Sequence, residues 1–273
     1  MTGIEHIRTT FAQAKAANRA AFMPYLPVGY PDLPTSLDLL QALAEAGADL
    51  IEVGVPFSDP LADGPVIQAA TQQALAQGVT PADCLAAVRR LRQRRVAVPL
   101  MLMGYINPIL AYGVERYAAD AADAGADGLI IPDLPPDEAE EVEAACQRHG
   151  LAMIYLVAPT STTERIAQAA RHSTGFIYLV SVAGITGARA DLPPHLAGFV
   201  ARVRALADLP LAVGFGIGTP AQAAAVAGIA DGVVVGSALV KLAGGDAPRP
   251  AVLAAARALA AAAHTPLPRP DSL

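Results

Sequence analysis

The feature that most constrains the fold of this 273-residue chain is an alternation, repeated eight times, of short apolar runs with helical patterns. The runs are apolar on both faces, as parallel strands are when they lie between a packed barrel interior and an outer layer of helices. We therefore predict strands at residues 21–26, 50–55, 98–103, 128–131, 152–157, 176–180, 211–214 and 232–236.

Helices are predicted between these strands, at residues 35–45, 81–92, 114–124, 137–147, 162–171, 197–207, 220–227 and 250–262. A doubly wound open sheet would show the same alternation, but eight strands, each followed by a helix, favour a closed α/β fold, the single (β/α)8 TIM barrel. We interpret residues 1–263 as one catalytic domain, and we expect the proline-rich tail at 264–273 to be disordered.

An extra N-terminal helix is indicated by Ile4, Ile7, Phe11 and Ala14, whose spacing produces one apolar stripe that we expect to cover the barrel floor. Three related tetrapeptides are also predicted to lie at the floor of the barrel. Ala-Gly-Ala-Asp occurs at 46–49 and 124–127, and Gly-Ile-Ala-Asp at 228–231, each between a predicted helix and the next strand. Glycine there can adopt the left-handed conformation that closes a helix. The opposite strand ends would then hold the active site.

The composition excludes several classes of protein. A net charge of −6 leaves no basic surface for nucleic acid. No segment joins about 18 uncharged apolar residues, so neither a membrane span nor a secretory signal is predicted. Cys84 and Cys146 lie in apolar helical patterns, and we interpret them as reduced core thiols of a cytoplasmic protein.

Glu52 is the most unusual residue of the predicted strands. Its neighbours Ile51 and Val53 are apolar, and strand alternation places Glu52 on the face opposite theirs. If that face is the barrel interior, poor solvation raises the pKa of the carboxyl group and suits it to general acid or base catalysis. The alternative is a structural carboxylate paired with an arginine or lysine.

The strand continues into a proline-rich loop that contains Asp59 and Asp63. Aspartate beside proline or glycine commonly caps a turn, so position alone leaves a functional and a structural interpretation open for Asp63. Glu52, Asp59 and Asp63 could together bind a divalent cation. However, no histidine is near and the spacing matches no metal motif, so we expect no metal.

Two glycine-rich segments predict a phosphate site. Residues 214–218 follow the seventh strand, and Gly236 and Ser237 precede a predicted short helix after the eighth. Barrels frequently bind phosphate at this place through backbone N–H groups, although plain tight turns are the alternative. A third segment, residues 181–191, contains two glycines and small residues. We interpret it as a mobile lid that excludes water, the alternative being a loop without a function.

The loop after the second strand also carries a family resemblance. The pattern Glu-x-Gly-x-Pro-Phe-Ser-Asp-Pro-x-Ala-Asp-Gly-Pro at 52–65 resembles the most characteristic motif of the tryptophan synthase alpha subunit family. The resemblance extends over residues 22–31, 105–108, 178–187, 214–218 and 236–241, and so covers nearly the whole barrel.

The resemblance implies that Glu52 is the proton-transfer carboxylate and that Asp63 accepts a hydrogen bond from the indole N–H group. It also implies substrate contacts at Tyr178 and the lid residue Thr186, walls of the indole pocket at Phe215, Tyr25 and Leu102, phosphate contacts at Gly187, Gly216, Gly236 and Ser237, and a partner interface at Asp59, Pro60 and Asn107. Some relatives have an arginine where Val182 stands, so we expect lid ordering to differ here.

By the same resemblance, the chain is expected to split indole-3-glycerol phosphate into indole and D-glyceraldehyde 3-phosphate without a cofactor. The indole would pass to a beta subunit that carries pyridoxal phosphate, within an alpha2beta2 heterotetramer. Two alternatives are a stand-alone lyase of the same ancestry and a regulatory phosphosugar-binding barrel that switches a partner. An indole-glycerol-phosphate synthase would need a catalytic lysine on an early strand, and the only lysines, Lys15 and Lys241, do not lie at an upper strand end.

Overall fold

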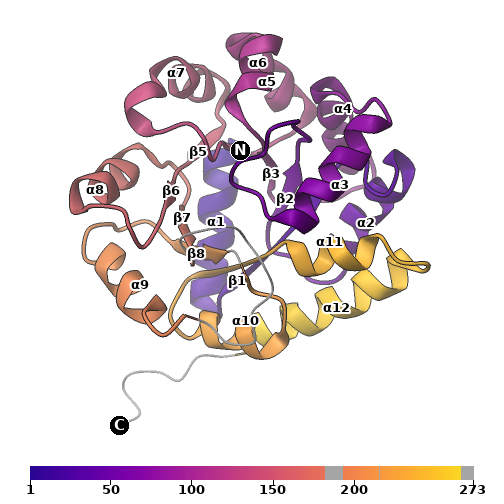
Figure 1. The fold of residues 1–273 in the computed structure, drawn as a ribbon. Helices are drawn as coiled ribbons and strands as arrows, with labels where there is room; N and C mark the ends of the chain where they lie inside the picture. The colour runs from indigo at the N-terminus through magenta and orange to yellow at the C-terminus, as the bar shows by residue number, and fades with distance from the viewer. Residues whose placement is uncertain (182–192, 215, 266–273) are drawn as a thin grey trace.

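The fold is a closed barrel, seen along its axis in Figure 1, where helices form a ring around the strands. The computed structural model describes residues 1–181, 193–214 and 216–265. Within them, parallel strands form one sheet in the order β5-β4-β3-β2-β1-β9-β8-β7-β6. These strands are β1 (Ala21–Pro27), β2 (Ile51–Gly54), β3 (Leu100–Met103), β4 (Gly128–Ile130), β5 (Ala152–Ile154), β6 (Leu156–Val157), β7 (Ile177–Val180), β8 (Leu211–Gly214) and β9 (Gly232–Val235). The predicted (β/α)8 barrel is confirmed.

The fifth predicted strand is divided into β5 and β6, and this division is where the barrel closes. β5 pairs with β4, whereas β6 pairs with β7. Tyr155 lies between them, and its N–H group donates to the Ser173 hydroxyl (3.2 Å) instead of to a strand. Its carbonyl oxygen accepts the N–H group of Tyr178 (3.0 Å), so hydrogen bonds connect the two edges through one residue.

The helices follow the predicted positions, with ends that shift by a few residues. They are α1 (Gly3–Ala16), α2 (Leu33–Glu45), α3 (Pro65–Ala76), α4 (Pro81–Gln93), α5 (Ile106–Tyr112), α6 (Val114–Ala124), α7 (Glu140–His149), α8 (Thr163–His172), α9 (Leu196–Arg204), α10 (Pro220–Ala227), α11 (Ser237–Ala243) and α12 (Pro248–Ala263), with a 3-10 turn η1 (Pro136–Glu138) before α7. Helices α3 and α5 were not predicted from the sequence. Proline at the first position of α3 and the buried stripe of Ile67, Ala70 and Ala74 explain why α3 forms.

Helix α1 lies across the barrel floor, as predicted, and is visible behind the strands at the centre of Figure 1. Its buried face consists of Ile7, Phe11 and Ala14. The ring of Phe11 lies 5.5 Å from that of Phe176, at the start of the sixth predicted strand. Burying this stripe closes the lower end of the barrel and leaves the carboxyl ends of the strands as the open end.

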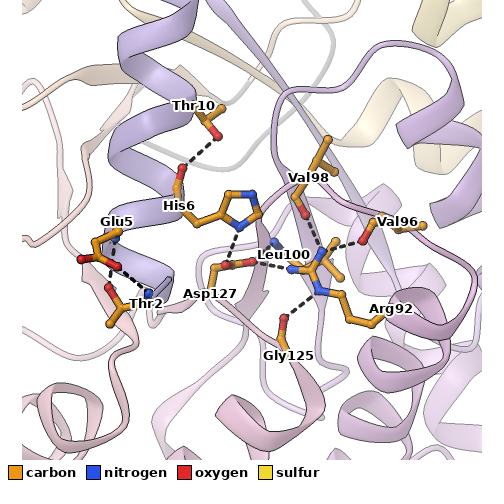
Figure 2. A network of polar contacts seen from close by, with 10 residues as sticks. All are labelled: Thr2, Glu5, His6, Thr10, Arg92, Val96, Val98, Leu100, Gly125 and Asp127. Carbon is orange, nitrogen blue, oxygen red and sulfur yellow. Dashed lines mark hydrogen bonds and ion pairs between the residues drawn. The ribbon is translucent and has the colours of Figure 1, made fainter.

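The three predicted joints on the floor share one hydrogen-bond pattern. Asp49, Asp127 and Asp231 each donate a backbone N–H group to the carbonyl of a residue at the start of the preceding strand (2.9 Å in all three). Each carboxylate accepts the N–H group of that same residue. A guanidinium also contacts each one, from Arg19, Arg92 and Arg204 respectively. Figure 2 shows Asp127 between Arg92 and the ring of His6.

The glycines of these joints do not all have the predicted conformation. Gly47 and Gly125 are left-handed, with φ of +97° and +94°. Gly228 has φ of −66°, so the prediction is wrong there. Its N–H group donates to Ala224 (3.1 Å), and that of Ala230 to Val226 (2.9 Å), because the last helical turn of α10 continues through this joint.

Both cysteines are buried and free, in agreement with their interpretation as core thiols. In the described ranges, no helix is long and apolar enough to cross a membrane.

Candidate active site

A cavity lies inside the barrel at the carboxyl ends of the strands. Its walls are Tyr25, Glu52, Asp63, Ile67, Met103, Tyr178, Gly216, Val234, Gly236 and Ser237. These residues belong to strands β1, β2, β3, β7 and β9 and to the segments that follow β2, β8 and β9. Residues far apart in the sequence therefore meet where active sites of this fold occur.

Glu52 points into this cavity and is fully buried. Among the described residues, neither of its carboxyl oxygens has a hydrogen-bond partner, so the alternative of a paired structural carboxylate is not seen there. Burial penalises the charged form and raises the pKa of Glu52 to about 8. At neutral pH this carboxyl group is protonated and can donate a proton to a molecule in the cavity.

Asp63 reaches the same cavity from the loop between β2 and α3 and is 6% exposed. The hydroxyl of Tyr105 donates to its Oδ2 atom (3.0 Å). Burial raises the pKa of Asp63 to about 6, an effect that the Tyr105 hydrogen bond opposes. Asp63 is thus a stronger acid than Glu52, and around pH 7 the two carboxyl groups hold opposite protonation states.

Tyr105 fixes the loop that carries Asp63, a role that was not predicted from the sequence. Its hydroxyl oxygen accepts the N–H group of Ala62 (3.1 Å), and its ring lies 5.2 Å from that of Phe57. Both contacts connect the loop after β2 to the residue that follows β3. One signal was available in the sequence, because a polar aromatic residue directly after a barrel strand lies at the catalytic end.

Tyr25 on β1 and Tyr178 on β7 line the cavity, and each lies over a glycine of a neighbouring strand. A Cβ atom on Gly54 would lie 2.4 Å from the Tyr25 hydroxyl, and one on Gly214 would lie 2.2 Å from the Tyr178 hydroxyl. Any larger residue at these two glycines would collide with the tyrosine hydroxyls, so glycine leaves room for both rings.

Leu102 does not line the cavity, and its neighbour Met103 does. Successive side chains of a strand point to opposite faces. Glu52 faces the interior and pairs in register with Met101, so Met101 and Met103 share that face and Leu102 faces the helices. The prediction that Leu102 forms a wall of the indole pocket is therefore corrected to Met103.

The predicted phosphate residues Gly216, Gly236 and Ser237 meet at one side of the cavity. Gly216 has φ of +87°, a conformation that favours glycine, and it lines the cavity. Thr186, Gly187 and Phe215 lie outside the described residues, as do most of the lid and the tail.

The predicted partner residues lie on the rim around this opening. Asp59 and Asn107 are exposed and Pro60 is half-buried. Two leucines near them are also exposed, Leu61 by 90% and Leu110 by 53%. Large apolar side chains in water at the rim are typical of a surface that another protein covers.

Comparisons with known proteins agree on one family. The family model described as tryptophan synthase alpha chain matches residues 11–264. The tryptophan synthase alpha chain of Chloroflexus aurantiacus is 51% identical over 237 residues, which cover 87% of this chain and 89% of the relative. That of Roseiflexus sp. is 53% identical, over 88% of this chain and 92% of the relative.

Solved structures lead to the same family. A chain of Mycobacterium tuberculosis tryptophan synthase superposes with a TM-score of 0.88 at 47% identity, over 95% of this chain and 98% of that one. Tryptophan synthase subunit alpha from Legionella pneumophila also gives 0.88, at 40% identity, over 96% of this chain and 98% of that one.

Proposed function

Since the chain belongs to the tryptophan synthase alpha chain family, we propose that it is the lyase that cleaves indole-3-glycerol phosphate into indole and D-glyceraldehyde 3-phosphate. The observation that carries the proposal is Glu52, a fully buried carboxyl group without a partner among the described residues, in one cavity with the more acidic Asp63. A retro-aldol cleavage needs such a pair of groups.

The first step protonates the substrate ring. The carboxylic acid of Glu52 donates its proton to C3 of the indole, and the ring nitrogen becomes part of an iminium group that keeps its N–H. The carboxylate of Asp63 stabilises this positive charge and accepts a hydrogen bond from the N–H group. An ionised Asp63 next to a protonated Glu52 is therefore the required starting state, and their pKa values of about 6 and about 8 favour it.

The second step breaks the carbon–carbon bond. The carboxylate of Glu52 removes the proton from the hydroxyl group on the glycerol carbon attached to C3, which becomes the aldehyde. The bonding electrons return to the ring and neutralise the iminium nitrogen, and indole is released. Glu52 ends the cycle protonated, as it began.

The remaining residues position the substrate. Backbone N–H groups at Gly216 and Gly236, with the Ser237 hydroxyl, would hold the phosphate, and we extend this role to Gly187. Tyr25, Tyr178, Met103 and Phe215 would enclose the indole and glycerol parts, and Thr186 would close the lid over them. Fixing the phosphate keeps the scissile bond next to both carboxyl groups.

The family name implies a beta partner, and we infer an alpha2beta2 heterotetramer. Asp59, Pro60 and Asn107 would contact the beta subunit, and burial of Leu61 and Leu110 would contribute apolar area. The barrel would need no cofactor of its own, with pyridoxal phosphate only in the beta subunit. We place the complex in the cytoplasm.

The test is release of indole from indole-3-glycerol phosphate by the chain alone and after titration with a beta subunit. We expect weak activity alone, strong stimulation, and a bell-shaped dependence of kcat/KM on pH with limbs near 6 and 8. High activity alone would favour the stand-alone lyase. Absence of indole in both conditions, with intact binding of glycerol phosphate, would favour the regulatory barrel.

A further inference from the structure

The seam at which the barrel closes carries a cluster of polar side chains outside the cavity. Its members are Glu143 of α7, Tyr155 between β5 and β6, and His172 and Ser173 at the end of α8. Tyr155 is only 2% exposed and Ser173 only 5% exposed, so their polar groups depend on partners within the protein. We call these four residues the seam cluster. The proposed mechanism uses none of them.

Tyr155 is held at three points. Its hydroxyl donates to Oε1 of Glu143 (2.5 Å), and its N–H group donates to the Ser173 hydroxyl (3.2 Å). Its carbonyl oxygen accepts the N–H group of Tyr178 (3.0 Å). Burial and the hydrogen bond to Glu143 raise the pKa of Tyr155, so the phenol keeps its proton and acts as a donor at neutral pH.

His172 holds the carboxyl group to which Tyr155 donates. Its Nδ1 atom lies 2.9 Å from Oε1 and 3.1 Å from Oε2 of Glu143. The rings of His172 and Tyr155 meet edge to face, with centroids 6.2 Å apart. Glu143 therefore contacts both the seam and the last turn of α8, and these contacts fix the place to which the Tyr155 hydroxyl is attached.

The carbonyl of Tyr155 connects this cluster to the cavity. Tyr178 lines the cavity, and its N–H group is bound to Tyr155 on the seam side. The strand on that side, β6, has only two residues, and two register pairs join it to β7. Leu156 pairs with Tyr178 and shares its face, so alternation directs Tyr155 toward α7 and α8. With so short a strand beside it, the position of Tyr178 depends on how firmly Tyr155 is held.

We propose that the seam cluster positions Tyr178 against the substrate, and that Tyr155 is the positioning residue through which it does so. The cluster contacts Tyr178 through its backbone and contributes no group to the reaction. This inference rests on the proposed function, because it concerns the wall that Tyr178 would form beside the indole and glycerol parts of the substrate.

The test measures binding of two phosphate compounds to the full chain bound to its beta subunit. One is 3-(indol-3-yl)propyl phosphate, which lacks the glycerol hydroxyls and cannot be cleaved, and the other is glycerol phosphate, which lacks the indole ring. Tyr155→Phe keeps the ring and removes only the hydrogen bond to Glu143. We expect the Kd of the indole compound to rise about 5-fold and that of glycerol phosphate to change less than about 2-fold. In turnover, KM should rise about 5-fold with kcat nearly unchanged.

A double-mutant cycle separates positioning from a general loss of stability. In a Tyr178→Ala background the side chain to be positioned is absent, so adding Tyr155→Phe should change the Kd of the indole compound by less than about 1.5-fold. Glu143→Ala removes the acceptor and should act like Tyr155→Phe. Tyr117→Phe removes an equally buried phenol in α6, and Thr2→Ala removes the capping box of α1 on the barrel floor. Neither control should change the Kd.

A measurement without ligand makes the outcome independent of the reaction. In the full chain labelled with 13C-tyrosine, the ring signals of Tyr178, identified by their loss in Tyr178→Phe, should shift in Tyr155→Phe and stay in place in Thr2→Ala. Unchanged Tyr178 signals, an unchanged Kd of the indole compound, or an equal effect in the Tyr178→Ala background would each overturn the proposal. Failure of the proposed function looks different. The wild type would then release no indole with or without a beta subunit, and the Tyr178 signals would still decide whether Tyr155 positions that ring.

Discussion

Two carboxyl groups only three residues apart, at strand β2, have opposite properties. Asp49 lies two residues before the strand, on the barrel floor, and Glu52 lies inside the strand, facing the cavity. Asp49 accepts hydrogen bonds from Arg19, His264 and the N–H group of Phe22, and these contacts lower its pKa to about 2 against the effect of burial. Glu52 has no such partner among the described residues, and burial raises its pKa to about 8.

The difference shows that the environment, more than the residue type, assigns each acid its task. On the floor, arginines and backbone N–H groups at the start of a strand bind the aspartates, and these contacts stabilise the joints between helices and strands. In the cavity, glycines, phenols and apolar walls leave a carboxyl group protonated and reactive. Stability and chemistry are thus separated along one short strand.

The largest effect is expected when the carboxyl group in the cavity is replaced. Glu52→Gln removes the proton donor and keeps the shape, so indole release should fall by at least about 1,000-fold. Binding of glycerol phosphate, measured by calorimetry, should be retained, because the predicted phosphate residues are unchanged. Near-normal turnover would show that another group transfers the proton.

On the barrel floor, Asp127→Asn should lower the free energy of unfolding by about 3 kcal/mol. The substitution leaves the half-buried guanidinium of Arg92 and the ring of His6 without the carboxylate that they share. Urea unfolding measures this change, and kcat should stay close to the wild-type value. The control is Asp123→Asn, which removes an exposed pair with Arg89 and should cost no more than about 0.5 kcal/mol. Equal losses in both variants would contradict the floor pattern.

Asp63→Asn sharpens the contrast within the cavity, because the amide keeps the size of the side chain but not its charge. We expect the loss of at least about 2 kcal/mol of transition-state stabilisation, seen in kcat/KM. Glu52 should still be protonated at neutral pH, so a purely structural role for Asp63 would instead leave kcat/KM nearly intact.

Asp49 and Glu52 should change the free energy of unfolding with pH in opposite directions. The lowered pKa of Asp49 stabilises the folded state above about 4, and about 2 kcal/mol is lost as the pH falls toward 2. The raised pKa of Glu52 acts oppositely, because its contribution is present below about pH 4.5 and is lost as the pH rises through about 8. The plot of unfolding free energy against pH, measured with urea, should flatten between about pH 2 and 4 in Asp49→Asn and between about pH 4.5 and 8 in Glu52→Gln. Parallel curves for the two variants would contradict this assignment.

Much of this arrangement could be predicted from sequence, because periodicity and position determine it. Runs of residues that are apolar on both faces predicted the strands, and the alternation of side chains along a strand placed Glu52 in the barrel interior. Alternation also shows why Leu102 was a wrong choice, since one residue along a strand changes the face. Tyr105 could not be connected to Asp63 from sequence, because their contact depends on how two loops 42 residues apart meet. The break at Tyr155 depends on the Ser173 hydroxyl and has no local signal.

The floor anchors have a practical consequence for engineering. His6 of α1 contacts Asp127, and His264, just after α12, contacts Asp49, so both terminal helices are attached to the face opposite the cavity. A fluorescent protein or purification tag fused beyond either helix would project from that face. It would leave the substrate entrance and the rim with Leu61 unobstructed.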